Sequence, residues 1–136
     1  KNKMIGYINN KTPFDKSGWY NTRDLVERRS DGFIKIVGRK SAIISVGGLK
    51  ILPSEIERIA LKNKELKYWK AYGKANPITG QHVEIICEPK NFNQNNEKLV
   101  SELKQSFSEE LNESFVPLKI KLKKIEISYR YKKSLN

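Results

Sequence analysis

The stretch that decides the fold is GRKSAIISVGGLKILPSEIE, residues 38–57. One short apolar segment precedes Gly47-Gly48 in this stretch and another follows it. Adjacent glycines can adopt the positive φ angles that a tight turn between two strands requires. Pro53 suits the first turn of a helix, where its missing N–H is not needed. We therefore predict two short strands, a glycine turn and a helix over residues 53–63.

A β-hairpin is predicted immediately upstream of this stretch. Two alternating runs, LVERR and FIKIVGR, flank the turn Ser30-Asp31-Gly32. An Asp-Gly pair between alternating runs is the strongest short-range signal for a hairpin. Before the hairpin, the sequence indicates a strand over residues 4–8 and a turn over residues 14–20.

Downstream of residue 57, apolar patterns predict strands over residues 68–74 and 83–87 and a last strand over 118–127. Between them, apolar residues recur at steps of three and four, which predicts a helix over residues 96–114. The predicted fold class is α+β: a small mixed sheet with two main helices packed on it, preceded by the β-hairpin.

The composition limits the classes of function. The 136 residues fit one domain, or one domain and a piece of another. No apolar run approaches the roughly 20 residues of a membrane span. The net charge of +12 raises nucleic acid as a partner, but the lysines are scattered, so we expect no specific nucleic acid. A basic nucleic-acid-binding domain remains a weaker alternative. The single cysteine, Cys87, allows no intrachain disulfide and favours a cytoplasmic location.

Three separated segments resemble motifs of the acyl-adenylate-forming enzymes, which include acyl-CoA synthetases, luciferase-like enzymes and the adenylation domains of peptide synthetases. The segment GWYNTRDL, residues 18–25, is similar to GW(Y/F)xTGDL, with Arg23 where the motif has glycine. Residues 38–57 are similar, without a gap, to GRxxDxIKxxGxRIxPxEIE. Residues 115–135 are similar to a third motif, VPxxixfvdxiPxTxxGKxxR.

The resemblance implies the distal end of a large N-terminal domain over residues 1–39 and a small C-terminal domain over residues 40–136. Such a region belongs to an ATP-dependent carboxylate ligase, which forms an acyl-AMP and passes the acyl group to CoA or to the phosphopantetheine thiol of a carrier protein. ATP and Mg would be held mainly by the large N-terminal domain, which lies outside these 136 residues. The region alone is therefore expected to be inactive.

The same resemblance implies the partners: its own N-terminal domain, a carboxylic acid substrate and, where the acceptor is a protein, an acyl-carrier protein. One alternative class stays open at this point. A degenerate, non-catalytic ligase domain could be kept as a protein-interaction module.

The resemblance also implies roles for individual residues. Asp24 and Arg39 match the residues that bind the ribose or a phosphate of ATP and AMP, for which a carboxylate and a planar guanidinium are suited. Lys40 and Ser41 match the hinge between the two domains. Lys133 matches the catalytic lysine, which would stabilise the negative charge that develops as the acyl-AMP forms. The alternatives are an exposed aspartate, a solvent-facing arginine, a rigid turn and a disordered basic tail.

Gly47, Gly48 and Lys50 match the loop that faces CoA or pantetheine in the second half-reaction. The alternative for the glycines is a tight turn and nothing more. His82 and Cys87 have no second metal-binding residue nearby, so we expect no metal site. We expect Cys87 in a core strand and His82 at the surface or on an edge. Two glutamates of the second motif, Glu55 and Glu57, are interpreted as helix-start charges rather than catalysts.

Overall fold

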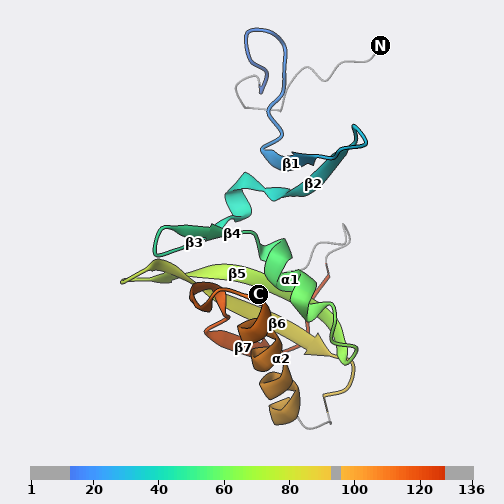
Figure 1. The fold of residues 1–136 in the computed structure, drawn as a ribbon, viewed down its shortest axis with the longest axis vertical. Coiled ribbons are helices and arrows are strands. Elements are labelled where there is room, and N and C mark those ends of the chain that lie inside the picture. Colours follow the sequence, from blue (N-terminus) through green and yellow to red (C-terminus); the bar gives the residue numbers. More distant parts are fainter. Residues whose placement is uncertain (1–12, 93–95, 128–136) are drawn as a thin grey trace. The chain divides into compact units, whose positions relative to one another are not determined.

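The computed structural model describes residues 13–92 and 96–127. The chain divides into two compact units, a hairpin unit, Lys1–Ser41, and a sheet unit, Ala42–Asn136. Figure 1 shows the ribbon of each unit. The assignment of these units to a large and a small enzyme domain, predicted at residues 1–39 and 40–136, stays a prediction.

The hairpin unit is built on the two antiparallel strands β1 (Asp24–Arg28) and β2 (Ile34–Arg39). The side chain of Asp31 accepts a hydrogen bond from the Phe33 amide at 3.1 Å, and Gly32 has a φ of +86°. The Asp-Gly signal therefore acts as predicted, and the hairpin is confirmed. The predicted strand over residues 4–8 lies outside the described residues.

The turn predicted over residues 14–20 is also present. Phe14 and Tyr20 form an antiparallel bridge, and the carboxylate of Asp15 accepts hydrogen bonds from the amides of Ser17 and Trp19, both at 2.9 Å. An aspartate at the start of a turn satisfies such amides without help from the rest of the chain.

The sheet unit contains a mixed five-stranded sheet. Central strand β6 pairs with β5 along one edge, and with β3 and β7 along the other, while β4 extends the sheet beyond β3. Only β7 runs parallel to its neighbour among the pairings that the structure describes. The strands are β3 (Ile44–Val46), β4 (Leu49–Ile51), β5 (Leu66–Asn76), β6 (Gly80–Pro89) and β7 (Lys119–Leu122).

Two helices, α1 (Pro53–Ala60) and α2 (Asn96–Glu110), lie against this sheet (Figure 1). They share one core with the apolar side chains that alternate along β6, where Val83, Ile85 and Cys87 are at most 1% exposed. Burial of such side chains is the main favourable term in the stability of a small domain. The predicted α+β class, a small mixed sheet with two main helices, is confirmed.

Several predicted boundaries were too long, and the causes are local or tertiary. Helix α1 ends at Ala60: the Leu61 amide still bonds four residues back, but the amides of Lys62 and Asn63 bond three residues back, which tightens the last turn. Helix α2 ends at Glu110, and the side chain of Asn112 then accepts a bond from the Ser114 amide at 3.0 Å and starts a 3-10 turn. The predicted strand over residues 118–127 stops at Leu122.

Candidate functional site

The two residues predicted to bind nucleotide lie opposite each other in the hairpin unit. Asp24 and Arg39 are cross-strand partners in β1 and β2, and Arg39 Nε lies 3.0 Å from Asp24 Oδ1. The arginine side chain is 67% exposed and the aspartate side chain 23%. This contact joins the guanidinium Nε of Arg39 to one carboxylate oxygen of Asp24, and it does not include the two terminal guanidinium nitrogens or Asp24 Oδ2.

Arg23, which replaces the motif's glycine, has a φ of +59°. Left-handed backbone costs an L-residue roughly 1–2 kcal/mol, and glycine adopts it freely. Two hydrogen bonds fix this conformation: the Arg23 amide donates to Asn21 Oδ1 at 2.8 Å, and the Arg23 carbonyl accepts from the Lys40 amide at 3.0 Å. The loop therefore keeps a backbone path that favours glycine although its side chain has changed.

The predicted hinge residues, Lys40 and Ser41, begin the 3-10 helix η1 (Lys40–Ala42). Both residues are exposed, and the division between the two compact units falls directly after Ser41. Their role as a hinge stays a prediction.

Gly47 and Gly48 form the turn between β3 and β4, called here the glycine turn. Their φ angles are +57° and +87°. A Cβ atom added at either position would meet nothing within 4 Å, so the backbone conformation and not the lack of space calls for glycine. Lys50 follows in β4 and is exposed. The predicted turn is present, and its predicted contact with CoA or pantetheine stays a prediction.

Few bonds attach the glycine turn to the rest of the sheet. Strand β3 pairs with β6 through a single register pair, Val46 and Gly80. The amide of Gly47 donates to the carbonyl of Thr79 at 2.9 Å, and the amide of Ser45 donates to the side-chain oxygen of Gln81 at 2.8 Å. Two hydrogen bonds thus connect the β3–β4 hairpin to the turn between β5 and β6 and to the start of β6, besides the burial of Ile44, Val46 and Ile51 in the core.

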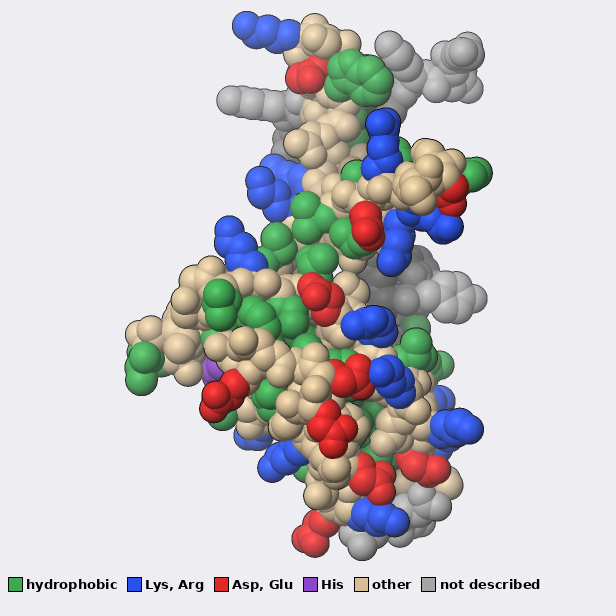
Figure 2. Space-filling view, viewed as in Figure 1, with side chains coloured by type: hydrophobic (Ala, Val, Ile, Leu, Met, Phe, Trp, Pro, Cys, Tyr) green, Lys and Arg blue, Asp and Glu red, His purple; other side chains and the backbone are tan. Residues whose placement is uncertain are grey.

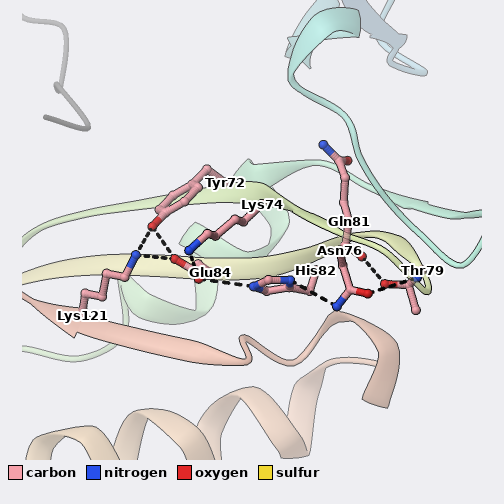
Figure 3. Close-up of polar contacts among 8 residues, drawn as sticks. All are labelled: Tyr72, Lys74, Asn76, Thr79, Gln81, His82, Glu84 and Lys121. Atoms are coloured by element: carbon pink, nitrogen blue, oxygen red, sulfur yellow. Dashed lines mark hydrogen bonds and ion pairs between the residues drawn. The ribbon is translucent and has the colours of Figure 1, made fainter.

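A buried carboxylate on β6, Glu84, is the centre of a polar cluster that the sequence did not predict (Figure 3). Its oxygens accept hydrogen bonds from Tyr72 Oη at 2.7 Å and from Lys121 Nζ, and Lys74 Nζ lies 3.6 Å away. His82 Nε2 lies 3.2 Å from Glu84 Oε1. We call this set of five residues the Glu84 cluster.

Burial and hydrogen bonding act in opposite directions on the carboxyl group of Glu84. Burial raises its pKa, but the hydrogen bonds from Lys121, Tyr72 and His82 outweigh burial and lower the pKa to about 2. The bonds to Glu84 and Tyr72 raise the pKa of Lys121. The pKa of Tyr72 is raised by burial and by its bond to Glu84. The cluster is therefore an ionised pair bridged by a neutral tyrosine at neutral pH.

His82 was predicted at the surface or on an edge, and the edge alternative is wrong. The residue lies on the central strand β6 rather than on an edge, and its side chain is 18% exposed. Besides Glu84, it contacts Asn76, whose Nδ2 lies 3.5 Å from His82 Nδ1. Cys87 is fully buried in the core as predicted, and burial raises the pKa of its thiol to about 12.

A groove of about 330 Å³ lies beside the glycine turn. Its walls come from the turn, from the β5–β6 connection and from the segment before β7; they include Gly47, Leu49, Asn76, Thr79, His82 and Leu118. The lining therefore combines polar side chains, such as those of Asn76, Thr79 and His82, with apolar ones, such as those of Leu49 and Leu118. Such a mixture is typical of small-molecule sites.

The remaining predicted residues divide into two groups. Glu55 accepts a hydrogen bond from the Leu52 amide at 3.1 Å, in keeping with a helix-start role. Glu57 instead reaches the sheet, where it accepts from the Ala71 amide at 2.9 Å. Lys133 lies outside the described residues, so its catalytic role stays a prediction.

Within residues 13–92 and 96–127, no group of three or more acidic, histidine or cysteine side chains could hold a metal ion. No helix of this described part is long and apolar enough to cross a membrane. Figure 2 shows that acidic and basic side chains alternate on the visible face of the sheet unit and form no continuous basic patch there.

Comparisons with known proteins give consistent relatives. An acyl-CoA synthetase of Alternaria alternata is 32% identical over 124 residues, which are 88% of this chain and 22% of that protein. A medium/long-chain fatty acid–acyl-carrier-protein ligase of Mycobacterium tuberculosis is 50% identical over 60 residues, 42% of this chain and 11% of that protein. A long-chain-fatty-acid–CoA ligase of Escherichia coli is 31% identical over 101 residues, 72% of this chain and 18% of that protein.

The chain therefore spans less than a quarter of these relatives, and it matches a C-terminal part of them. No family model matches the chain. Among solved structures, the o-succinylbenzoate CoA synthetase of Bacillus subtilis with its acyl-adenylate intermediate has a TM-score of 0.78 at 22% identity, over 96% of this chain and 27% of that one. An ATP-bound chimera has a TM-score of 0.77 at 23% identity, over 86% of this chain and 23% of that one. These two likenesses show a shared fold.

Proposed function

Because the chain belongs to the adenylate-forming, acyl-CoA synthetase-like ligases, as a C-terminal part of such an enzyme, we propose that the whole protein joins a carboxylic acid to a thiol at the expense of ATP. The observation that carries this proposal is the 32% identity to an acyl-CoA synthetase across 88% of the chain. The carrier-protein ligase among the relatives supports a thiol, either of CoA or of a carrier protein, as the acceptor.

The proposed reaction has two steps. A carboxylate oxygen of the acid attacks the α-phosphorus of ATP, so that an acyl–AMP bond forms and pyrophosphate leaves. The thiol sulfur then attacks the acyl carbon, a C–S bond forms, the C–O bond to AMP breaks and the thiol proton passes to solvent. We propose that magnesium and most of the ATP are held by the large N-terminal domain that the resemblance to these ligases implies.

On the nucleotide side, we assign Asp24 and Arg39. Their pairing fixes both side chains at the end of the hairpin, and the exposed guanidinium can donate to ribose or phosphate through the nitrogens that do not contact Asp24. The ribose hydroxyls would donate to the carboxylate. Lys133 would stabilise the charge on the phosphate in the first step.

In the second step, we propose that the glycine turn and Lys50 face the acceptor thiol, after a rotation about Lys40 and Ser41. The open space around Gly47 and Gly48 supports this assignment, because nothing in the described structure crowds the turn. A turn without side chains lets a ligand approach the backbone closely.

The hairpin unit also supports a partner domain. Val26, Ile34 and Ile36 share one face of the hairpin, and their exposed fractions are 56%, 62% and 68%. A contiguous exposed apolar face indicates an interaction site. We propose that the rest of the enzyme's own N-terminal domain, of which the hairpin is the distal end, covers this face. We also propose a cytoplasmic location, in keeping with the free Cys87.

The test is ATP–pyrophosphate exchange with the complete gene product. Dodecanoate is the first acid to use, because the relatives include medium- and long-chain fatty acid ligases. We expect Arg39→Ala to raise the KM for ATP about tenfold, the loss of a charge-assisted hydrogen bond. Lys133→Ala should slow exchange about a hundredfold or more.

Arg58→Ala is the matched control, since Arg58 is an exposed arginine on α1 in the sheet unit. It should leave exchange unchanged, and the 136-residue chain alone should give none. An Arg39→Ala enzyme with the KM of the unaltered enzyme would refute the nucleotide assignment. Failure of the complete gene product to exchange pyrophosphate with any of a panel of carboxylates would refute the ligase itself.

A further inference from the structure

We infer that Asn76, Gln81 and His82 are positioning residues that hold the glycine turn, Gly47–Gly48, in place for the thiol acceptor. This inference rests on the proposed function, in which the glycine turn faces the acceptor. Asn76 is the last residue of β5, and Gln81 and His82 lie at the start of β6; none of them lies in the three segments that resemble the family motifs.

The β3–β4 hairpin has few hydrogen bonds to the rest of the sheet. Each of its strands has three residues, and one register pair joins β3 to β6. Short two-stranded hairpins have marginal stability by themselves. Burial of Ile44, Val46 and Ile51 anchors the base of the hairpin in the core. Two further hydrogen bonds hold it near the glycine turn, from the Gly47 amide to the Thr79 carbonyl and from the Ser45 amide to the Gln81 side chain.

Gln81 reaches β3 because Gly73 leaves it room. A Cβ atom at Gly73 would lie 3.0 Å from both Cδ of Gln81 and Cγ2 of Ile44, closer than ordinary van der Waals contact. The Gln81 side chain thus passes over the bare backbone of β5 to accept the Ser45 amide at 2.8 Å. Any side chain at position 73 would crowd this arrangement, and a longer or shorter one at position 81 would misplace the acceptor oxygen.

Asn76 positions the acceptor of the other hydrogen bond, the carbonyl of Thr79. Its Oδ1 accepts hydrogen bonds from the amides of Ile78 at 2.9 Å and Thr79 at 3.2 Å, which closes the turn. The carbonyl of Thr79 is the group that receives the Gly47 amide. An asparagine that holds its own turn in this way therefore also sets the position of the glycine turn.

His82 links this turn to the rigid part of the sheet (Figure 3). Asn76 Nδ2 can donate only, so at 3.5 Å from His82 Nδ1 it calls for an acceptor there, and His82 Nε2 then carries the proton that Glu84 accepts at 3.2 Å. Glu84 in turn is held by Tyr72 and Lys121. A continuous path of polar contacts therefore runs from β7 to the glycine turn and along one wall of the adjoining groove.

The first arm of the test is amide hydrogen exchange in the 136-residue chain. Gln81→Met keeps the side-chain volume and removes the acceptor, and Gln81→Glu keeps an acceptor oxygen. We expect Gln81→Met to speed exchange at Ser45 and Gly47 about three- to tenfold, the loss of one hydrogen bond. Ile85, in the core of β6, should keep its protection. Gln81→Glu should restore most of the protection at Ser45.

A matched control stands at the other end of β5. Asn63 accepts the Glu65 amide at 2.9 Å, the same kind of side-chain-held turn as at Asn76, but its turn lies before β5 and away from the glycine turn along the chain. Asn76→Ala should speed exchange at Gly47, and Asn63→Ala should not. Because Asn76 lies at the end of β5 and outside the hydrophobic core, this pair also carries the test if Gln81→Met fails to fold.

The second arm measures the acceptor step in the complete gene product with CoA as the probe. Gln81→Met should raise the KM for CoA about three- to tenfold while pyrophosphate exchange stays unchanged. A merely structural loss of stability would reduce both half-reactions together. Gln81→Glu should return the KM for CoA toward the unaltered value.

The possible results distinguish the positioning role of these residues from the proposed ligase function. Unchanged exchange at Gly47 in both Gln81→Met and Asn76→Ala, or faster exchange that extends equally to Ile85, would overturn the positioning role. Faster exchange at Gly47 with an unchanged KM for CoA would overturn the link to the acceptor. Absence of pyrophosphate exchange in the unaltered gene product contradicts the proposed function. The amide hydrogen exchange data then still decide whether these residues hold the glycine turn.

Discussion

The replacement of Glu84 by glutamine gives the sharpest test of the electrostatics in the sheet unit. Glu84 is 2% exposed, and its carboxylate receives hydrogen bonds from Tyr72, His82 and Lys121. Glutamine has nearly the same shape but carries no charge, and its amide nitrogen cannot accept any of these bonds. The substitution therefore removes the ionised form of the cluster with little change in packing.

The magnitude follows from the pKa of Glu84. Its ordinary value is 4.5, and although burial opposes ionisation, the hydrogen bonds from Lys121, Tyr72 and His82 bring it to about 2 in the folded protein. At roughly 1.4 kcal/mol per pH unit, the ionised form contributes about 3 kcal/mol to the free energy of unfolding. That is a large share of the stability of a domain of this size.

The pH dependence has a definite sign. A carboxyl group whose pKa is lower in the folded state binds its proton more readily in the unfolded state. Its stabilisation is complete above the ordinary value of 4.5 and is lost as the pH falls toward about 2. The difference in unfolding free energy between the unaltered chain and Glu84→Gln should therefore be largest at neutral pH and should shrink below pH 4.5.

Urea denaturation of both proteins at a series of pH values from about 7 down to about 2.5 measures this difference. Glu126→Gln serves as the control, because Glu126 is an exposed glutamate after β7. It should change the unfolding free energy by no more than a few tenths of a kcal/mol at any pH. A gap between the unaltered chain and Glu84→Gln that is as wide near pH 2.5 as at pH 7 would refute this account of the cluster.

Three further substitutions or labels test the core and the turns. Gly48→Ala should lower the unfolding free energy by about 1 kcal/mol through its positive φ alone. Gly73→Ala should cost about 1–3 kcal/mol by crowding, because its new Cβ would meet Gln81 and Ile44 at 3.0 Å. Urea denaturation measures the loss of unfolding free energy in both variants. Equal amide hydrogen exchange at Ser45 in Gly48→Ala and Gly73→Ala would contradict the distinction between a strained backbone and a crowded Gln81 side chain. Buried Cys87, with a pKa raised to about 12, should react with a thiol-specific disulfide reagent at pH 8 only after unfolding, and rapid labelling of the native chain would show that the core is open there.

Most elements of this fold could be predicted from the sequence because their signals act over a few residues. Asp31-Gly32 closes the hairpin, Gly47-Gly48 closes the β3–β4 turn, and Pro53 begins α1. Each of these residues determines the backbone at its own position. No distant partner is needed for such a signal to be correct.

The ends of the two helices were predicted too late for local reasons, but the other errors occur where a distant side chain decides. The last strand was predicted to reach residue 127, but it ends at Leu122. The buried carboxylate of Glu88 accepts the Ile125 amide at 2.6 Å, in place of a ladder bond to a neighbouring strand. Apolar residues alternate from Leu118 to Leu122, and the pair Lys123-Lys124 then shifts the phase of the pattern, so the end of the strand has a local signal. No local pattern shows that the Ile125 amide has the Glu88 side chain as its acceptor.

The Glu84 cluster was missed for the same reason. A single glutamate within the apolar run VEIIC indicates a buried acid, and that signal was present in the sequence. Its partners Tyr72 and Lys121 lie 12 and 37 positions away, on two different strands. The pairing of β5 and β7 with β6 has to be known before these three side chains can be brought together.

The substitution at Arg23 shows what a motif constrains. A motif glycine can be needed for its missing side chain or for its backbone conformation, and replacement distinguishes the two. Here the arginine keeps a φ of +59°, and the Lys40 amide donates to its carbonyl at 3.0 Å, so the loop before β1 is tied to the residue after β2. Asp24 follows Arg23 and Arg39 precedes Lys40, so this hydrogen bond lies next to both residues, whose side chains pair at 3.0 Å. The constraint at this position is therefore the backbone path that brings an acid and an arginine together, and a chain can meet it without glycine at a cost of roughly 1–2 kcal/mol.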